Sequence, residues 1–309
     1  MVNREIKTME LIRQGKNNKE ICNILKIDLM DLKNILISLK NKGVLYNKKY
    51  TLEGNTLYIP NKDLEGDTSK DIDIRMSKNS FKSILISDLH LGTKEERLDL
   101  LNLVYEYASK EGIHLIINGG DLINGLTKER KNITQTMMEQ CFYFIEKHPF
   151  DKNILNICVL GNHDIKCLTK EGINFKYLLE TNRLDFAISG VGEGRINLKK
   201  DSIYMYHPLS CEENNLPWKR FILVGHSHHY KIKIYKENVA IFIPALSNYV
   251  PESMGIIPSF LVMETYLNKN FIESIRLENL TFNNNKITHL GVQELECGLH
   301  KRKSTCYYL

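Results

Sequence analysis

Five short stretches of this 309-residue chain place metal-binding residue types directly after an apolar run. They read ISDLHLG, INGGDLI, VLGNHD, YMYHP and VGHSHH. Such apolar runs are typical of buried strands, and strand ends in α/β proteins are where ligands bind. The polar residues concerned are, in chain order, Asp88, His90, Asp121, Asn162, His163, Asp164, His207, His226 and His228. Their placement favours a chemical role.

Carboxylates and imidazoles together suit Mn, Fe or Zn better than Ca or Mg. Because side chains alternate along a strand, D-x-H and H-x-H would place two ligands on one side of an extended backbone. None of the five stretches contains cysteine, which argues against a structural zinc site. We expect two divalent metal ions that share a bridging oxygen ligand, as in sites for phosphoryl transfer, with Mn first and Fe, Zn or a mixed pair as alternatives. His163 lies beside a ligand without being needed as one, which suits a general acid.

Taken singly, each stretch also has an ordinary explanation. A lone D-x-H is more often a solvated turn or a helix N-cap than a pair of ligands. Asp121 after two glycines is compatible with a turn, and His207 before a proline is compatible with a structural histidine at a strand end. The metal site is favoured by the joint occurrence of all five, in order and each after an apolar run.

In this order, D-x-H, G-D, G-N-H-[DE], H and G-H-x-H resemble the signature of the calcineurin-like metallophosphoesterase superfamily, over residues 81–244. The resemblance implies an α/β fold, a β-sandwich of mixed sheets flanked by helices. The ligands it implies are Asp88, His90 and His228 for one ion and Asn162, His207 and His226 for the other. It further implies that Asp121 bridges the ions, together with a hydroxide that attacks phosphorus. His163 would then protonate the leaving oxygen, and Asp164 would orient or tune His163.

Two positions depart from the pattern of this superfamily. Its protein Ser/Thr phosphatases carry an Asp-Arg pair after the bridging aspartate, whereas this chain has Asn124 and Gly125, so a phosphoprotein substrate is not expected. The third block usually reads His-Gly, and here His207 precedes Pro208, which restricts the backbone of the histidine. The SDLHLG and GHSHH stretches are most similar to those of double-strand-break repair nucleases and small bacterial phosphodiesterases.

Strands and helices must alternate to position these residues. The apolar runs predict strands at 83–87, 115–118, 154–160, 203–206 and 221–224, and helices at 95–110 and 133–147. Further strand-like runs occupy residues 238–267, and 271–282 is compatible with another strand, whereas 298–309 is compatible with a flexible end. We assign residues 81–309 to one metallophosphoesterase domain, with 268–309 as a C-terminal extension.

Residues 1–60 predict a small separate domain. Apolar residues recur at helical spacing up to Gly15, and Asn17 with Glu20 is a capping box for a second helix. Asp28 is a plausible N-cap of a third helix that ends at Gly43, and the pattern around residues 53–55 indicates a hairpin. This order is typical of a winged helix-turn-helix, and the polar residues 61–80 read as a linker.

In a winged helix-turn-helix the third helix enters the major groove and nearby basic residues contact phosphates. The candidates for DNA contact are Lys33, Asn34, Lys40, Asn41, Lys42, Lys48 and Lys49. The alternative is a protein-protein or self-association module of the same shape.

Charge and composition are compatible with these interpretations. Residues 1–50 hold 11 Lys/Arg and 5 Asp/Glu, a difference of +6, so the remaining residues carry 5 − 6 = −1. Seven scattered cysteines without a CxxC pair favour reduced thiols and a cytoplasmic location. We find no apolar run of about 18 residues and no signal-peptide pattern, so we expect no membrane association.

Three functions follow from the sequence. The first is a Mn-dependent DNA nuclease whose N-terminal domain holds the duplex, with loop 127–132 and His229 as possible phosphate contacts. The second is a phosphoesterase for small nucleotides or other phosphate esters, with residues 1–60 used for homodimerisation or regulation. The third is a DNA-binding regulator without enzymatic activity. Trp218 is expected to be a packing anchor more than a stacking platform for bases.

Overall fold

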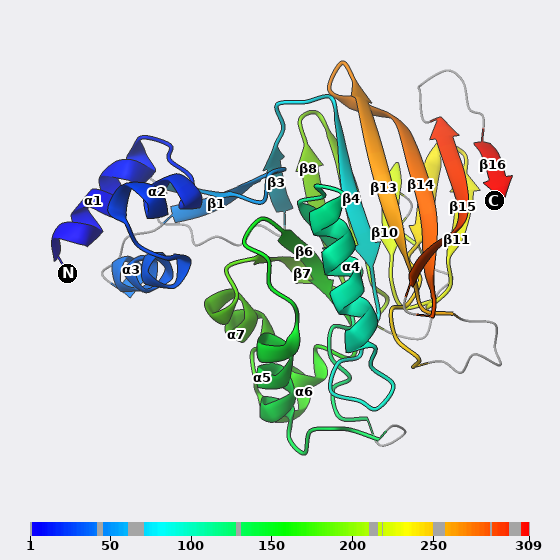
Figure 1. Ribbon diagram of the computed structural model, residues 1–309, viewed down its shortest axis with the longest axis horizontal. Coiled ribbons are helices and arrows are strands. Elements are labelled where there is room, and N and C mark those ends of the chain that lie inside the picture. The colour runs from blue at the N-terminus through cyan, green and yellow to red at the C-terminus, as the bar shows by residue number, and fades with distance from the viewer. Residues whose placement is uncertain are drawn as a thin grey trace.

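The structure is a computed structural model that describes residues 2–41, 46–60, 71–127, 131–209, 216–217, 219–249, 257–284, 286–296 and 304–308. Two mixed eight-stranded sheets pack face to face (Figure 1). The apolar core between them joins Leu85 and Ile117 of one sheet to Met205 and Leu223 of the other. Mixed sheets with flanking helices make this an α/β architecture, as expected from the sequence.

One sheet has the strand order β16-β15-β14-β13-β4-β5-β6-β7. Strands β4 (Ser80–Ile86), β5 (Leu115–Asn118), β6 (Leu155–Leu160) and β7 (Phe186–Val191) are parallel, whereas β13 (Ser259–Asn268), β14 (Phe271–Asn283), β15 (Lys286–Glu296) and β16 (Ser304–Tyr308) are antiparallel. Its outer face packs against α4 (Leu98–Lys110), α5 (Met137–Lys147), α6 (Lys166–Glu171) and α7 (Phe175–Asn182). Burial on both faces explains why every residue of β5 and β6 is buried.

The second sheet has the order β11-β12-β10-β9-β8-β3-β1-β2. Its strands are β1 (Tyr46–Thr51), β2 (Thr56–Pro60), β3 (Asp71–Arg75), β8 (Glu193–Leu198), β9 (Asp201–Tyr206), β10 (Phe221–Val224), β11 (Lys231–Tyr235) and β12 (Asn238–Phe242). Strands β9 and β10 are parallel, so their carboxyl ends meet at one edge. The two sheets therefore present the ends of β4, β5, β6, β9 and β10 to the loops that carry the predicted ligands.

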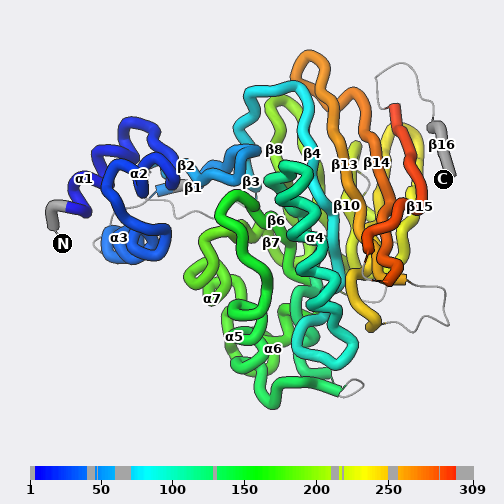
Figure 2. The backbone as a smooth tube through the Cα atoms, viewed as in Figure 1, coloured from blue at the N-terminus to red at the C-terminus, as the bar shows by residue number. Residues whose placement is uncertain are grey.

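The N-terminal region contains α1 (Val2–Arg13), α2 (Asn18–Leu25) and α3 (Leu29–Asn41), followed by the β1–β2 hairpin (Figure 2). The predicted capping box of Asn17 and Glu20 is present, and Asp28 accepts a hydrogen bond from the backbone of the third helix. The helices and hairpin occur in the predicted order, and the winged-helix class stays a prediction. The hairpin is not detached, because Tyr50 of β1 pairs with Ile74 of β3 and so extends the second sheet.

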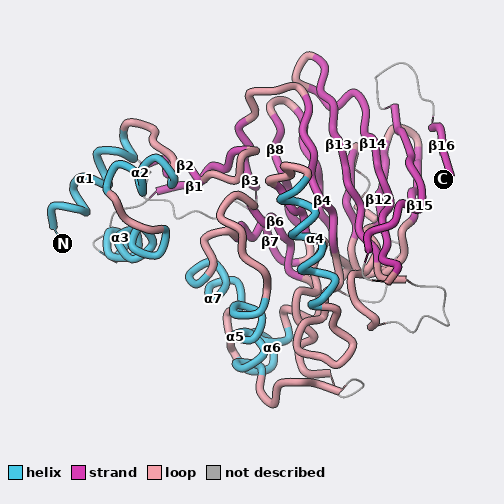
Figure 3. Tube along the Cα trace, in the orientation of Figure 1, coloured by secondary structure: helices cyan, strands magenta, loops and turns pink. Residues whose placement is uncertain are grey.

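Four expectations differ from the structure (Figure 3). Within the expected linker, residues 71–75 form β3 and β4 begins at Ser80, while 61–70 lie outside the described residues. Residues 71–75 form a strand because buried Ile72 and Ile74 alternate with charged neighbours. This short alternation was not recognised within a polar, turn-like composition. Residues 304–308 of the expected flexible end form β16. Helix α5 begins at Met137, four residues late, because Thr136 and Glu139 cap it. Helix α4 begins at Leu98, three residues late.

The described helices include none that combines the length and apolar character needed to cross a bilayer.

Candidate metal centre

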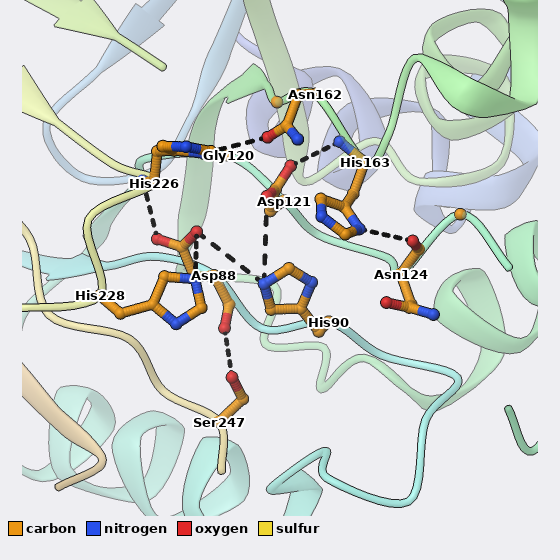
Figure 4. Close-up of polar contacts among 12 residues, drawn as sticks. Asp88, His90, Gly120, Asp121, Asn124, Asn162, His163, His226, His228 and Ser247 are labelled. Atoms are coloured by element: carbon orange, nitrogen blue, oxygen red, sulfur yellow. Dashed lines mark hydrogen bonds and ion pairs between the residues drawn. The ribbon is translucent and has the colours of Figure 1, made fainter. Parts of the chain in front are cut away.

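All seven predicted metal ligands converge where strands from the two sheets end. Asp88 and His90 follow β4, Asp121 follows β5, and Asn162 follows β6. His207 follows β9, and His226 and His228 follow β10. Six of the seven, together with the predicted acid His163, form three overlapping groups in which all ligand atoms lie within 4.8 Å of one another, namely Asp88–His90–His228, His90–Asp121–His163 and Asp121–His207–His226. Figure 4 shows the two carboxylates between the imidazoles.

The first group matches the residues expected for one ion. His228 Nε2 lies 3.3 Å from Asp88 Oδ1, and His90 Nε2 lies 4.0 Å from the same oxygen. Asp88 Oδ2 accepts a hydrogen bond from the backbone N–H of His226 at 3.1 Å. All three side chains are buried, so a cation bound here would be held in a region of low dielectric.

The residues expected for the other ion, Asn162, His207 and His226, also lie together and are called the second group below, with Asp88, His90 and His228 as the first. Asn162 Oδ1 lies 3.0 Å from His207 Nε2 and 3.1 Å from His226 Nδ1. His207 Nδ1 donates to the carbonyl of Gly119 at 2.7 Å, which directs Nε2 toward the group. The proline that follows His207 therefore does not displace its ring from the site.

Asp121 lies between the two groups. Its Oδ2 is 4.0 Å from His90 Nε2 on one side and 3.3 Å from His207 Nε2 on the other. Its Oδ1 accepts the backbone N–H of His163 at 2.8 Å. This is the position that the resemblance assigns to a bridging carboxylate.

The charges of the site favour bound cations. Burial alone would raise the pKa of Asp88, but the imidazoles of His228 and His207 outweigh burial and lower this pKa to about 2. Burial likewise opposes protonation of His207, but the Asp121 carboxylate raises the pKa of His207 to about 9. Two adjacent buried carboxylates thus favour positive charge on the neighbouring imidazoles. Bound divalent ions would supply that positive charge.

His90 provides an independent test of fit. Burial lowers the pKa of His90 to about 3, so its ring is neutral. Both ring nitrogens are buried, and neither has a hydrogen-bond partner among the residues that the structure describes. A neutral imidazole with a free lone pair aimed at two carboxylates is a good metal ligand, whereas an unpartnered buried polar atom is otherwise costly.

Five of the seven ligands have left-handed backbone conformations. They are Asp88, His90, Asp121, His226 and His228, with φ between 45° and 71°. Positive φ is uncommon outside glycine and clusters at functional sites, because each instance costs about 1–3 kcal/mol. The expectation of two ligands on one side of an extended backbone is therefore wrong. The pairs converge because left-handed turns at the strand ends redirect them.

Glycines allow the ligand loops to approach one another. A Cβ on Gly161, the first residue of GNHD, would lie 2.2 Å from Asp121 Oδ1 and 2.7 Å from His207 Nε2. Gly120 has φ +109°, and a Cβ there would lie 2.5 Å from His207 Nδ1. Any side chain at these positions would displace a ligand of the second group.

The predicted acid and its neighbour have distinct surroundings. His163 is mostly buried, and its Nδ1 lies 2.6 Å from the carbonyl oxygen of Asn124. Asp164 accepts hydrogen bonds from the backbone of Ile123 and Gly161, at 3.0 and 2.8 Å. Burial, with Asp121 nearby, raises the pKa of Asp164 to about 7. Asp164 therefore ties the loop after β5 to the loop after β6, and its tuning of His163 stays a prediction.

Three contacts in the site were not foreseen from the sequence. Tyr249 stacks on His90, with ring centroids 3.9 Å apart and an interplanar angle of 18°. Ser247 Oγ donates to the carbonyl of Asp88 at 2.7 Å. Lys166 Nζ lies 3.2 Å from Nδ1 of His163. None of these residues belongs to a ligand motif, so sequence patterns gave no signal for them.

The residues predicted to contact DNA lie in the N-terminal region, and the prediction stays untested. Lys33 is buried at 8% exposure, and burial lowers its pKa. Asn34 is exposed, and Lys48 and Lys49 are half-buried, with Lys49 paired to Asp73 at 3.1 Å. The structure describes the side chain of neither Lys40 nor Asn41, and Lys42 lies outside the described residues.

Three further predicted contacts are described only in part. His229 is exposed directly after the His228 ligand. In loop 127–132, residues 128–130 lie outside the described part of the chain, as does Trp218.

Comparison with known proteins agrees with this geometry. The calcineurin-like phosphoesterase family model matches residues 81–242, which is more than half of the chain. The chain therefore belongs to the calcineurin-like phosphoesterase family, with buried His/Asp clusters that fit a dinuclear metal site. No curated protein matches it.

Several solved structures are similar to the chain at low scores. An archaeal phosphodiesterase is 16% identical, with a TM-score of 0.40, over 60% of this chain and 100% of that one. Vacuolar protein sorting 29 from Cryptosporidium parvum is 14% identical, with a TM-score of 0.40, over 71% and 100%. Vps29 from Entamoeba histolytica, complexed with zinc, is 10% identical, with a TM-score of 0.37, over 71% and 100%. Family membership rests on the sequence match, not on these structures.

Proposed function

We propose that the protein hydrolyses phosphodiester bonds with two divalent cations held by the two ligand groups. Mn is the metal that we propose in preference to Fe, Zn or a mixed pair. The observation that carries this proposal is the position of Asp121 between the groups, with His163 beside them. When bound, such a pair of cations polarises phosphoryl oxygens and acidifies water. Buried carboxylates and neutral imidazoles are the donors that this chemistry needs.

His163 is proposed to protonate the leaving oxygen. The carbonyl of Asn124 can only accept a hydrogen bond, and its 2.6 Å contact with Nδ1 is shorter than the 3.2 Å contact of Lys166 Nζ with the same atom. We therefore assign a proton to Nδ1, and Nε2 is left to deliver the second proton of the imidazolium. Burial lowers the pKa of His163, while the Asp121 carboxylate opposes that change. The Asp164 carboxyl keeps the backbone of both loops in register around this ring.

The test is a substrate panel on full-length protein stripped of metal and reloaded with Mn, Zn, Fe or Mg. We expect hydrolysis of a chromogenic phosphodiester to require reloading with metal. For substrates with poor leaving groups, we expect hydrolysis to be lost in His163→Ala. Hydrolysis that survives chelation would overturn the proposal. The absence of hydrolysis of every substrate with all four metals would instead favour the scaffold hypothesis, a regulator without enzymatic activity.

For the substrate we propose DNA, with the basic N-terminal region as its binding surface. The exposed basic residues there include Arg4, Lys7 and Arg13 on α1 and Lys26 after α2. Contacts between such residues and phosphates predict binding that weakens steeply with salt. Among the side chains that the structure describes, the exposed positive charge lies on α1 more than on α3, so the proposed contact surface includes α1 as well as the expected residues.

The DNA proposal is tested in the full-length protein, because removal of residues 1–60 would expose β3 as a sheet edge. The triple variant Arg4→Gln, Lys7→Gln, Arg13→Gln should weaken DNA hydrolysis at least tenfold and flatten its salt dependence. Hydrolysis of a small chromogenic diester should be unchanged. Equal effects on both substrates, or on neither, would contradict a DNA-binding role.

One observation favours the second candidate, a phosphoesterase for small esters. The outward surface of α3 carries Met30 at 54% exposure and Ile37 at 38%, whereas Lys33 of the same helix is buried. Exposed apolar side chains on a helix favour contact with protein over contact with DNA. Under this proposal Met30→Lys with Ile37→Lys would dissociate a homodimer in light scattering and leave hydrolysis of small diesters intact.

A further inference from the structure

The ring of Tyr249 lies among three imidazoles of the metal centre. Its centroid is 3.9 Å from that of His90, 5.7 Å from that of His163 and 5.8 Å from that of His228. Only the contact with His90 is stacked, at 18°, whereas the other two are edge-on or tilted. Tyr249 thus covers one face of the His90 imidazole and borders its neighbours.

The histidines of the site differ in what orients their rings. His207 donates from Nδ1 to the carbonyl of Gly119, and Nδ1 of His163 lies against the carbonyl of Asn124. A metal-binding histidine is usually fixed by such a hydrogen bond from its second nitrogen. Neither nitrogen of His90 has a hydrogen-bond partner among the described residues. Rings restrict the His90 imidazole instead: His163 and His228 border it, with centroid distances of 4.8 and 5.4 Å, and Tyr249 is the one of the three that stacks on its face.

The backbone that carries Tyr249 is fixed to the loop that carries His90. Ala245 pairs with Ser87, and Leu246 N–H donates to the carbonyl of Ser87 at 3.0 Å. Ser247 Oγ donates to the carbonyl of Asp88 at 2.7 Å, as Figure 4 shows.

A second set of contacts joins the two segments, the one that carries Tyr249 and the loop that carries His90, further along the chain. Ser247 forms a bridge with Glu96, and Asn248 N–H donates to the carbonyl of Glu95 at 2.9 Å. Glu96 in turn accepts from the backbone of Gly92 at 2.7 Å. The segment 245–249 and the loop 87–96 therefore form one unit, which gives Tyr249 a defined position over His90.

We propose that Tyr249 is a positioning residue that holds the His90 imidazole in the orientation needed to bind the ion of the first group. It does so by stacking, in place of the hydrogen bond that orients His207. The proposal rests on the metal centre of the proposed function and adds a residue that no ligand motif contains. It concerns the first group alone, because the ligands of the second group have their own contacts.

The test measures Mn²⁺ binding to the full-length protein by calorimetry. Tyr249→Leu should weaken one of two Mn²⁺ equivalents by about 10–100-fold, the usual loss when an outer-shell partner of a metal ligand is removed. Tyr249→Phe keeps the ring and should retain wild-type affinity within about threefold. Tyr177→Leu removes a tyrosine that is 60% exposed on α7 and serves as the matched control with unchanged binding.

Two backgrounds assign the effect to one group of ligands. In His226→Ala the first group remains, and adding Tyr249→Leu should weaken the remaining Mn²⁺ equivalent by the same factor. In His228→Ala the second group remains, and adding Tyr249→Leu should leave its affinity unchanged. Circular dichroism and thermal unfolding establish that each variant is folded.

The outcomes separate this inference from the function on which it rests. Wild-type affinity in Tyr249→Leu, equal weakening in both backgrounds, or equal weakening in Tyr249→Phe would each overturn the positioning role. If the wild-type protein binds no Mn²⁺, the proposed function itself fails, and the variants are then not needed to decide it.

Discussion

Two buried polar clusters occupy opposite ends of the parallel strands β4–β7. The metal centre lies at their carboxyl ends, whereas Arg183, Asp185, Asn156, Tyr105 and His148 cluster at the amino ends of β6 and β7. Both consist of residue types that are costly to bury. They differ in how that cost is met.

In the cluster at the amino ends, protein groups pair the charged side chains, and Nε2 of His148 is the buried ring nitrogen there without a hydrogen-bond partner among the described residues. Arg183 donates twice to Asp185, at 2.8 and 2.7 Å, and donates to the carbonyls of residues 145, 148 and 149. These contacts use all five N–H donors of its guanidinium. Asp185 also accepts from Asn156 at 3.2 Å, and Asn156 accepts from Tyr105 at 2.7 Å.

The metal centre is organised in the opposite way. Its carboxylates face imidazoles, the nitrogens of His90 have no hydrogen-bond partner among the described residues, and five ligands have strained backbones. A network whose charges are paired by protein groups stabilises the fold, whereas one that needs an external cation stores strain for function. The five predictions that follow test this contrast.

The largest effect is expected at the bridging position. Asp121→Asn removes the carboxylate shared by the two groups and should lower phosphodiester hydrolysis on the order of 10³-fold, about 4 kcal/mol of transition-state stabilisation. Asp99→Asn, at an exposed carboxylate, is the control and should leave the rate unchanged. Steady-state kinetics of both variants decide the matter, and hydrolysis within tenfold of wild type in Asp121→Asn would refute a bridging role.

The next effect concerns stability. Arg183→Met leaves the Asp185 carboxylate buried and unpaired, so we expect a loss of about 3–5 kcal/mol in the free energy of unfolding. Arg97 forms an Arg-x-Asp pair of the same bidentate geometry with Asp99, but at a more exposed site. Arg97→Met should therefore cost less than about 1 kcal/mol in the same urea titration. Similar losses in the two variants would remove the distinction between the networks.

Metal ions should stabilise the protein through the carboxyl-end cluster alone. With free Mn²⁺ at 100 times Kd, one site adds about 2.7 kcal/mol to the free energy of unfolding relative to chelated protein. Thermal unfolding with and without chelator measures this difference. Asp121→Asn should reduce the rise in unfolding temperature that Mn²⁺ causes, and Arg97→Met should not. An unchanged unfolding temperature in the wild-type protein would argue against a metal centre.

A smaller effect is expected from pH. Burial and the nearby Arg183 lower the pKa of His148 well below its ordinary value of about 6.5, so the unfolded chain binds a proton there that the folded protein does not. The contribution of His148 to the free energy of unfolding is thus fully present above pH 6.5. It falls as pH decreases, by up to about 1.4 kcal/mol per pH unit. Urea titrations at pH 7 and 5.5 in chelator, compared with His148→Leu, isolate this contribution. A variant with the wild-type slope would contradict it.

The residues of the site could be predicted from the sequence better than the backbone conformations that position them. Residue types and strand ends selected seven candidate ligands that the structure brings together, because apolar runs and ligand motifs are local signals. The left-handed turns of Asp88 and His226 were not predicted, since the enrichment of Asp and His at positive φ is too weak to locate a turn from sequence. Tyr249 was missed for a different reason. Its place over His90 depends on contacts between residues 245–248 and the distant loop 87–96.

The fold shows the same division between local and distant information. The bounds of β5 and β10 agree with the predicted 115–118 and 221–224, because turns end both apolar runs. Strand β3 was assigned to a linker, since five residues with only two apolar side chains carry little pattern of their own. Its strand conformation comes from pairing with β8 and β1, and neither strand is adjacent to β3 in the sequence.

The smallest predicted effect tests how independent the two clusters are. Tyr105→Phe removes the hydroxyl that donates to Asn156 at 2.7 Å and leaves a buried acceptor without that partner, a loss of about 1 kcal/mol in the free energy of unfolding. Because β6 alone connects Asn156 to Asn162, and Arg183 and Asp185 keep their contacts, Mn²⁺ affinity should remain unchanged. Tyr177→Phe, at an exposed hydroxyl, should alter neither quantity. A change in Mn²⁺ affinity in Tyr105→Phe would mean that strain at the carboxyl ends is maintained by the network at the amino ends, so that the clusters form one coupled unit.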